Sequence, residues 1–321
     1  MYIEDPELRF ISHTGQNSIQ PLLYLPFEMI ESAGKKKARG LILIIHGMAE
    51  HQLRYQSFAE YLSKHNYIVC TLDLPGHGRT APDEKHLGYF SEHDGSNKIQ
   101  LDIIELMNIL IQMYPGIPPI VFGHSMGSLI ARRFCATSGI KLAAAIFSGT
   151  PAPNAIAGIA VKLAEHSVKK NGGYYRDDKL NKLMSGKFQS RLPQALTPYD
   201  WISSDEEEVN KYVNDPLCGF VFTASGFKDL FTMVKSVSSR KWAASVQPNL
   251  PIMLFSGEQD PVGGFGLGVK KINRWLQKYG HQTHLILYEN GRHEMLNEQN
   301  RQIVWENVTE WLNELLPDVV K

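Results

Sequence analysis

The sequence contains the stretch Pro119-Ile120-Val121-Phe122-Gly123-His124-Ser125-Met126-Gly127. Its first four residues are typical of a short buried strand, and residues 128–134 behind it have the pattern of a helix. Between them lies a Gly-x-Ser-x-Gly motif, which in this setting predicts a sharp turn that carries a nucleophilic serine. An ordinary turn with a solvated Ser125 is the alternative, but the flanking strand and helix favour the nucleophile.

A nucleophilic serine needs a base to accept its proton and an acid to orient that base. With this type of turn, the acid and then the histidine follow the serine along the chain. Residues 252–261 have the pattern of an apolar strand that ends in a loop containing Asp260. Such loops lie at the carboxyl edge of a parallel sheet, where ligands bind. We therefore expect Asp260 to be the acid, with Glu258 and Asp229 as alternatives.

The histidines that follow Ser125 are His166, His281, His284 and His293. A further strand pattern, residues 285–288, ends in a glycine turn, and His293 follows that turn. His281 and His284 flank the start of the same strand, where a turn or sheet position suits them better. His293 is therefore the expected general base.

A serine nucleophile that attacks a carbonyl group also needs two backbone N–H groups that face the developing oxyanion. The residue after the nucleophile, Met126, supplies one of them, and a loop after an earlier core strand supplies the other. Residues 41–45 are an apolar run typical of a strand buried on both faces, and His46-Gly47-Met48 follows. We expect the Met48 amide to be the second donor, while a plain strand-ending turn is the alternative.

With these segments the chain resembles the α/β-hydrolases of the monoacylglycerol lipase and lysophospholipase group. The stretches that carry the resemblance are His46-Gly47-Met48-Ala49-Glu50-His51, Asp73-Leu74-Pro75-Gly76-His77-Gly78-Arg79, Gly123 to Ser128, Gly257-Glu258-Gln259-Asp260-Pro261-Val262 and Arg292-His293-Glu294-Met295-Leu296-Asn297. The resemblance implies that Ser125, Asp260 and His293 form a catalytic triad and that the same two amides form the oxyanion hole. It also implies that residues 73–78 form a structural loop beneath the site.

Strand and helix patterns alternate along most of the chain. The predicted strands are residues 41–45, 67–72, 120–122, 143–147, 252–255 and 284–288. Such alternation predicts an α/β fold with a mostly parallel central sheet and helices on both faces. Residues 8–12 and 20–25 indicate an opening hairpin, residues 34–40 a basic linker, and residues 299–316 a closing helix.

The alternation stops in the middle third, where helix-like and loop-like segments replace core strands. We therefore predict an α/β-hydrolase core of residues 1–150 and 249–321 with an inserted, mainly helical cap of residues 151–248. Residues 154–170 have helical spacing, and the acidic run that begins at Asp205 suits the start of a helix.

A group of apolar side chains in the predicted cap has two interpretations. Phe222, Phe227, Phe231 and Met233 are expected to bind the substrate by lining a tunnel for an acyl chain. Alternatively, they form the underside of the cap and pack on the core. The cap is also where we expect transient contact with a membrane surface.

Composition narrows the class of protein. The 321 residues contain 33 Lys plus Arg and 33 Asp plus Glu, so no basic surplus points to a nucleic acid partner. Cys70, Cys135 and Cys218 lie far apart without metal-site spacing, and so few cysteines suit a reducing compartment. The acidic amino-terminal residues lack the apolar stretch of a signal peptide, and no run approaches the ~20 apolar residues that span a bilayer. A cytoplasmic protein that needs no metal or organic cofactor is expected.

These features predict a serine hydrolase that cleaves carboxylic esters of lipids through an acyl-enzyme on Ser125. The resemblance implies a monoacylglycerol or a lysophospholipid as the substrate. A peptidase or amidase, or a thioesterase, could use the same triad, and a non-catalytic binding module could use the same fold. The predicted partner is a small-molecule ester.

Overall fold

The structure is a computed structural model, and it describes residues 2–15, 17–31, 38–186, 188–192 and 194–316. Residues 34–37 of the predicted basic linker lie outside this set. Within the described residues, no helix has both the length and the apolar character that crossing a bilayer requires.

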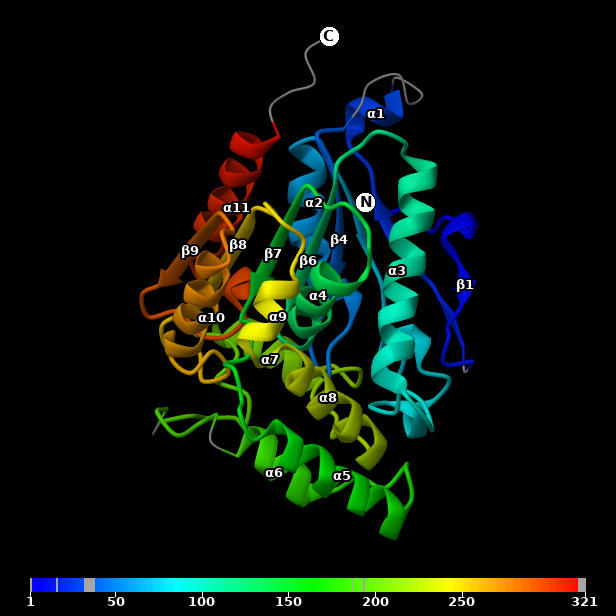
Figure 1. The fold of residues 1–321 in the computed structure, drawn as a ribbon, viewed down its shortest axis with the longest axis vertical. Coiled ribbons are helices and arrows are strands. Elements are labelled where there is room, and N and C mark those ends of the chain that lie inside the picture. The colour runs from blue at the N-terminus through cyan, green and yellow to red at the C-terminus, as the bar shows by residue number, and fades with distance from the viewer. Residues whose placement is uncertain (1, 16, 32–37, 187, 193, 317–321) are drawn as a thin grey trace.

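A seven-stranded sheet forms the centre of the molecule, with the strand order β3-β5-β4-β6-β7-β8-β9 (Figure 1). Its strands are β3 (Leu22–Tyr24), β4 (Gly40–Ile45), β5 (Tyr67–Thr71), β6 (Pro119–His124), β7 (Ala144–Ser148), β8 (Ile252–Gly257) and β9 (Thr283–Tyr288). All neighbours run parallel except β3, which pairs antiparallel with β5. The register pairs His124 with Ser148 and Ser148 with Phe255, so β6, β7 and β8 end side by side. The predicted mostly parallel sheet is confirmed.

The inner strands are buried because helices cover both faces of the sheet. Every residue of β4, β5, β7 and β8 is buried, and their side chains alternate between two hydrophobic cores. One core includes α3 (Gly95–Met113), α4 (Met126–Thr137) and α10 (Leu267–Lys278). The other includes α2 (Gln56–Lys64) and α11 (Arg301–Leu315). Figure 1 shows the two helix layers on opposite sides of the strands.

The amino-terminal segment differs from the predicted hairpin. Strand β1 (Phe10–Ile11) pairs with β2 (Ser18–Ile19) in a small sheet of their own. The expected second arm contains β3, which joins the edge of the main sheet because Leu22 and Leu23 are buried in opposite cores. Further short helices are α1 (Phe27–Glu31) and the 3₁₀ turns Pro6–Leu8, Gln52–Tyr55, Gly78–Thr80, Glu84–His86 and Met295–Asn297.

The connection from β7 to β8 carries helices. These are α5 (Ala157–Asn171), α6 (Asp178–Ser185), α7 (Glu206–Asn214), α8 (Ala224–Val237) and α9 (Arg240–Ser245). The predicted helix at 154–170 is confirmed as α5, and the predicted helix start is confirmed because the Asp205 side chain caps α7. Helix α8 contacts α5 on one side and α3 and α4 on the other, so it links the outer helices to the core. Helices α5 and α6 lie at the end of the molecule opposite α11 (Figure 1).

Arg132 of α4 joins both ends of this insertion. Its guanidinium donates to the Val237 carbonyl at 2.6 Å and lies within 3.5 Å of the Thr150 hydroxyl and the Pro151 carbonyl. The Trp242 ring lies 4.3 Å from the guanidinium carbon, and its indole N–H donates to the Arg132 carbonyl. A buried cation held by carbonyl dipoles and an aromatic face thus fixes this segment against α4.

Candidate active site

Ser125 lies between the end of β6 and the start of α4, at the sharp turn that the sequence predicts. Its backbone has φ 50° and ψ −117°, a region that residues with a side chain rarely adopt. Ser125 N–H donates to the Ser148 carbonyl at 2.9 Å, and the Ser128 hydroxyl donates to the Ser125 carbonyl at 2.5 Å. The neighbouring strand and helix therefore hold a strained residue at the edge of the sheet.

The glycines of the motif are needed because backbone packs directly on backbone. A Cβ on Gly127 would lie 2.1 Å from the Ile45 carbonyl oxygen, and a Cβ on Gly123 would lie 2.4 Å from the Gly127 carbonyl oxygen. The loop after β4 also approaches Ser125 closely, since a Cβ on Gly47 would lie 3.1 Å from Ser125 Cβ. The turn and this loop therefore meet at Ser125.

Asp260 and His293 come together at the same edge of the sheet. Asp260 Oδ1 lies 3.0 Å from His293 Nδ1. Because a carboxylate can only accept, Nδ1 carries the proton and Nε2 is left to accept another. The Ser256 hydroxyl donates to Asp260 Oδ2 at 2.7 Å, and Val262 N–H donates to Oδ1 at 2.8 Å. These bonds orient the carboxylate toward the imidazole.

The two alternative acids lie elsewhere. Glu258 is exposed to solvent. Asp229, on α8, accepts a hydrogen bond from Ser96 N–H at 3.1 Å, and burial raises its pKa to about 6. Among the described residues, the carboxylate that the structure places against His293 is that of Asp260.

Burial and mutual attraction act in opposite directions on the pKa values of this pair. Burial raises the pKa of Asp260, but the charge of His293 and the hydrogen bonds to the carboxylate hold it below its ordinary value. Burial lowers the pKa of His293, but the negative charge of Asp260, joined by Glu294 and Glu50, outweighs this. The raised pKa of His293 favours the imidazolium that forms when a serine hydroxyl gives up its proton.

Two rings that sequence reasoning did not assign to the site fix the position of His293. The ring centroids of His124 and Trp201 lie 4.8 Å and 5.1 Å from that of His293. Burial and the neighbouring His293 lower the pKa of His124 to about 3, so it stays neutral. Trp201 comes from the segment between α6 and α7, so the insertion contacts the imidazole directly.

The loop after β4 holds Met48 between two anchored neighbours. Gly47 N–H donates to the Glu50 carboxylate, and Ala49 N–H donates to His77 Nε2 at 3.3 Å. Burial lowers the pKa of His77 well below its usual value, which keeps this nitrogen an acceptor. His77 belongs to the loop that the resemblance placed beneath the site, and the structure shows that loop supporting the backbone around Met48.

A buried ion-pair network joins this loop to Glu294, the residue that follows His293. Arg54 lies 3.3 Å from the Glu50 carboxylate and also forms an ion pair with Glu294. The Tyr55 hydroxyl donates to Glu50 at 2.7 Å, and the guanidinium lies 5.0 Å from the ring centroid of Tyr212. Sequence reasoning missed this network, because Glu50 lies in a loop outside any helix and Glu294 is 240 positions from Arg54.

A cavity of about 750 Å³ lies where these elements meet, and Ser125, His293, Met48 and Met126 all line it. Glu50 and Glu294 add carboxylates to its wall beside them. Much of the wall is apolar and comes from the insertion, through Ile156, Ile159, Leu163, Leu183, Met184, Phe188, Trp201, Leu230, Phe231 and Val234.

The four predicted substrate-binding residues separate into two groups. Phe231 lines the cavity. Phe222, Phe227 and Met233 are absent from the described residues that line it, and they are buried in the hydrophobic core instead. The Phe222 ring packs 5.4 Å from the His77 ring, between centroids. An apolar pattern cannot distinguish a side chain that faces a cavity from one that packs on the core, and this explains the difference.

Comparison with known proteins places the chain in a family. The family model described as "Serine aminopeptidase, S33" matches residues 36–300. The chain belongs to this family. A monoacylglycerol lipase of Mycolicibacterium smegmatis is 29 % identical to it over 278 residues, which are 85 % of this chain and 88 % of that protein.

Solved structures agree with this placement. A highly thermostable carboxyl esterase from Bacillus coagulans, in complex with glycerol, has a TM-score of 0.89 and 30 % identity, covering 98 % of this chain and 99 % of that one. A lipase in its open form has a TM-score of 0.88 and 27 % identity, covering 99 % of this chain and 100 % of that one. The predicted membership of the α/β-hydrolases of the monoglyceride lipase group is confirmed, and the chain is a carboxylic ester hydrolase.

Proposed function

We propose that this hydrolase cleaves lipid esters of the monoacylglycerol or lysophospholipid type through an acyl-enzyme on Ser125. One arrangement carries the proposal: the buried Asp260–His293 pair and Ser125 meet at a mainly apolar cavity of about 750 Å³. The name of the Mycolicibacterium smegmatis relative, a monoacylglycerol lipase, supports the same substrate class.

The reaction follows from the roles of five residues. His293 Nε2 accepts the hydroxyl proton of Ser125 as its Oγ attacks the ester carbonyl carbon, and Asp260 holds the imidazole in the required tautomer. The amides of Met48 and Met126 donate to the oxyanion. His293 then protonates the leaving alcohol while the acyl group stays on Ser125. Water attacks the acyl-enzyme with His293 as its base, which releases the fatty acid and restores the hydroxyl.

The cavity suits a lipid ester in its size and in the position of its polar groups. Its volume falls within the range of about 300–1,000 Å³ that is common for ligand sites. The carboxylates of Glu50 and Glu294 lie beside the catalytic residues, where hydroxyl groups of a head group would donate to them. The apolar wall from α5, α6 and α8 would hold the acyl chain.

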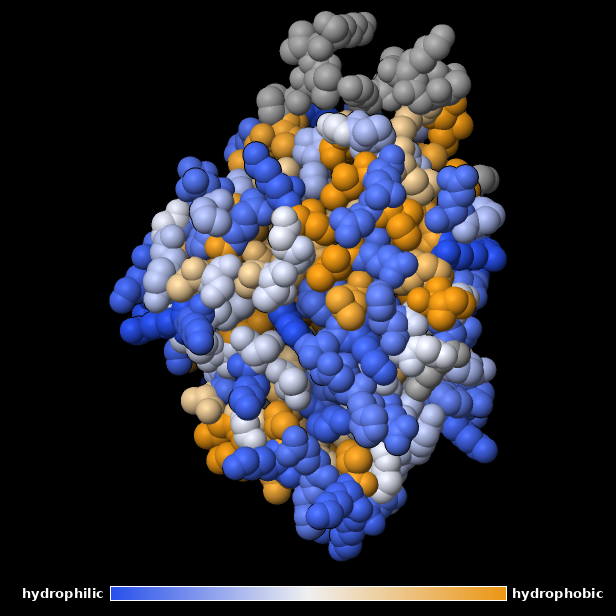
Figure 2. Space-filling view, turned by 45° about the vertical axis from the view of Figure 1, so that its right-hand side comes forward, coloured by the Kyte–Doolittle hydropathy of each residue, from blue (hydrophilic) through white to orange (hydrophobic). Residues whose placement is uncertain are grey.

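We also infer that residues 151–248 act as a cap through which the lipid enters. Ile156, Ile159, Leu163 and Leu183 line the cavity, yet between 50 % and 64 % of each residue is exposed. Figure 2 shows hydrophobic side chains among hydrophilic ones toward the end of the molecule where α5 and α6 lie. An apolar rim of this kind favours transient contact with a membrane surface.

The test is hydrolysis of a chain-length series of monoacylglycerols, with matched lysophospholipids and aminoacyl anilides, against a Ser125→Ala blank. Monoacylglycerol turnover that peaks at medium or long chains is the expected result. Covalent labelling of the wild type, but not of Ser125→Ala, by a fluorophosphonate probe is expected as well. Activity confined to the anilides, or none above the blank, would contradict the proposal and favour a peptidase or a binding role.

A further inference from the structure

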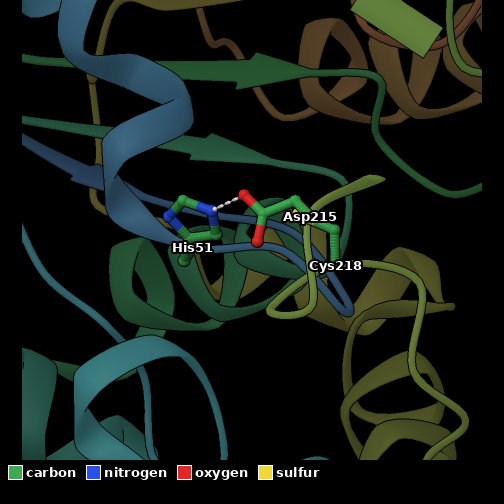
Figure 3. Close-up of side chains that lie close together, drawn as sticks. All are labelled: His51, Asp215 and Cys218. Carbon is green, nitrogen blue, oxygen red and sulfur yellow. Dashed lines mark hydrogen bonds and ion pairs between the residues drawn. The ribbon is translucent and has the colours of Figure 1, made fainter. Parts of the chain in front are cut away.

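Three metal-ligating side chains of different types come together outside the candidate triad (Figure 3). His51 lies in the loop after β4, and Asp215 and Cys218 lie between α7 and α8. His51 Nε2 lies 2.8 Å from Asp215 Oδ2, and the ligand atoms of all three residues lie within 4.8 Å of one another. Figure 3 shows the His51 ring directed at the Asp215 carboxylate, with Cys218 beside it.

We propose that His51, Asp215 and Cys218 form a binding site for Zn²⁺. Imidazole nitrogen, carboxylate oxygen and thiolate sulfur are the ligands of this ion, and three of them leave a fourth position for water. Tetrahedral coordination with bonds of about 2.0–2.3 Å places the ligand atoms roughly 3.3–3.8 Å apart. The hydrogen-bonded pair therefore has to open slightly, which rotation of side chains on loops allows, and the same rotation can bring the sulfur into this range.

The charges around the cluster favour a cation. Among the charged groups that act on Cys218, Arg54 has the largest effect, followed by Asp215, Glu50 and Glu294. Both glutamates are paired with the guanidinium, and Asp215 adds a third carboxylate. Three carboxylates around one guanidinium leave the region negative, and such a field attracts a divalent cation.

An ion can reach the cluster from solvent. The Asp215 side chain is 30 % exposed, whereas His51 and Cys218 are buried behind it. A hydrated ion can therefore bind the carboxylate first and then exchange water for nitrogen and sulfur. Binding releases the thiol proton to solvent, and the imidazole proton moves from Nε2 to Nδ1 so that Nε2 can coordinate.

The site lies where the insertion meets the loop that carries Met48. Gly219 N–H and the Tyr212 hydroxyl both donate to the Ala49 carbonyl at 2.9 Å. Cys218 and His51 are close neighbours of these residues in sequence, so a bound ion ties together the same two loops. Because the ion binds the folded chain, it raises the melting temperature.

The experiment is a titration of the metal-free protein with Co²⁺ alone, followed by Zn²⁺. Co²⁺ occupies zinc sites and reports a thiolate ligand by a charge-transfer band in the near ultraviolet. We expect one Co²⁺ per chain with this band, displacement by Zn²⁺, and a higher melting temperature. Cys218→Ala should lose the band and bind Zn²⁺ at least about 100-fold more weakly. Cys135→Ala, which removes a buried thiol elsewhere, should retain both properties.

A second variant keeps the proposal testable if Cys218→Ala folds poorly. Asp215→Asn preserves an acceptor for His51 but removes the charged ligand, so it should weaken Zn²⁺ binding by at least about 10-fold. Circular dichroism verifies the fold of each variant. The absence of a thiolate band in the wild type would overturn the proposal. Equal Zn²⁺ affinity in Cys218→Ala would do so too, because the metal would then occupy surface pairs such as His13 and Glu105.

Discussion

The central sheet and the helical insertion bury their apolar side chains to very different degrees. Every residue of β4, β5, β7 and β8 is buried between helix layers. In the insertion, Ile156, Ile159 and Leu183 are each more than half exposed, although they line the cavity. The loops at the sheet edge supply the candidate catalytic groups, whereas the insertion supplies much of the apolar wall.

This difference separates two kinds of contribution to function. Ser125 stands on backbone that cannot shift without disturbing buried strands, as the close approach of Gly127 to Ile45 shows. The exposed side chains of the insertion do not pack in the core, so we expect them to adapt to acyl chains of different length. Changes at the sheet edge should therefore impair turnover of every ester, and changes in the cap wall should impair only some.

The largest expected effect is that of Ser125→Ala. Removing the nucleophile should lower kcat by about 10⁶-fold. The loss should be similar for short and long esters, because the hydroxyl is needed whatever the acyl chain. Initial rates over a chain-length series, with thermal melting as the control for folding, measure this. A variant that keeps wild-type turnover of short esters would refute the assignment of the nucleophile.

The second largest effect is expected for Asp260→Asn, which should lower kcat by about 10⁴-fold for all esters. The amide lacks the negative charge that stabilises the imidazolium, and its NH₂ group can donate to Nδ1, which places the imidazole proton on Nε2 and removes the base. Glu258→Gln, at an exposed neighbour, is the matched control and should retain activity. If the two variants lost activity equally, the acid would have to be reassigned.

Leu163→Asp tests the wall of the insertion. It should lower kcat/KM for long-chain monoacylglycerols by about 10- to 100-fold, because a buried contact with the acyl chain of roughly 1.5–3 kcal/mol is lost. Turnover of an acetate ester should stay the same. Leu196→Asp is the control, since Leu196 is 82 % exposed and lies away from this cavity. An equal loss for the acetate ester would show that Leu163 supports the core instead.

The smallest expected effect is a shift in pH dependence for Glu294→Gln. The charge of Glu294 helps to raise the pKa of His293, and activity needs the neutral imidazole. Removing that charge lowers the pKa of His293, so the acid limb of kcat/KM should move to lower pH. A pH profile with an uncharged ester measures the shift, and Glu289→Gln, at an exposed site, should leave the limb in place. A shift of the acid limb of kcat/KM to higher pH would contradict the stated role of Glu294.

The sequence revealed features that depend on local patterns. Residues 41–45 are buried on both faces, so their apolar run identified β4 despite the lack of alternation. The sequence predicted that Asp260 and His293 lie together, because each follows an apolar strand pattern and parallel strands end at one edge of the sheet. The structure places the two side chains 3.0 Å apart. The prediction that residues 8–12 pair with residues 20–25 was wrong. Both segments have similar short strand patterns, but β3 pairs with β5 because its side chains are buried in both cores, which a local pattern does not reveal.

Contacts between distant segments were beyond the reach of sequence patterns. Arg54 and Glu294 are 240 positions apart, and His51 and Asp215 are 164 positions apart. The spacing of the cysteines gave no sign of a metal site, because spacing reveals only ligand sets that are local in sequence. The cytoplasmic location and the cap boundaries at 151 and 248 stay predictions.

The position of Arg132 has a consequence for how such enzymes diversify. One guanidinium contacts Pro151, where the insertion begins, and Val237, near its end. A segment whose two ends meet at one point can be exchanged as a cassette, because its removal leaves the connecting backbone close enough to rejoin. New substrate preferences can therefore arise by recombination of whole caps on an unchanged scaffold, provided that the recipient helix retains this arginine.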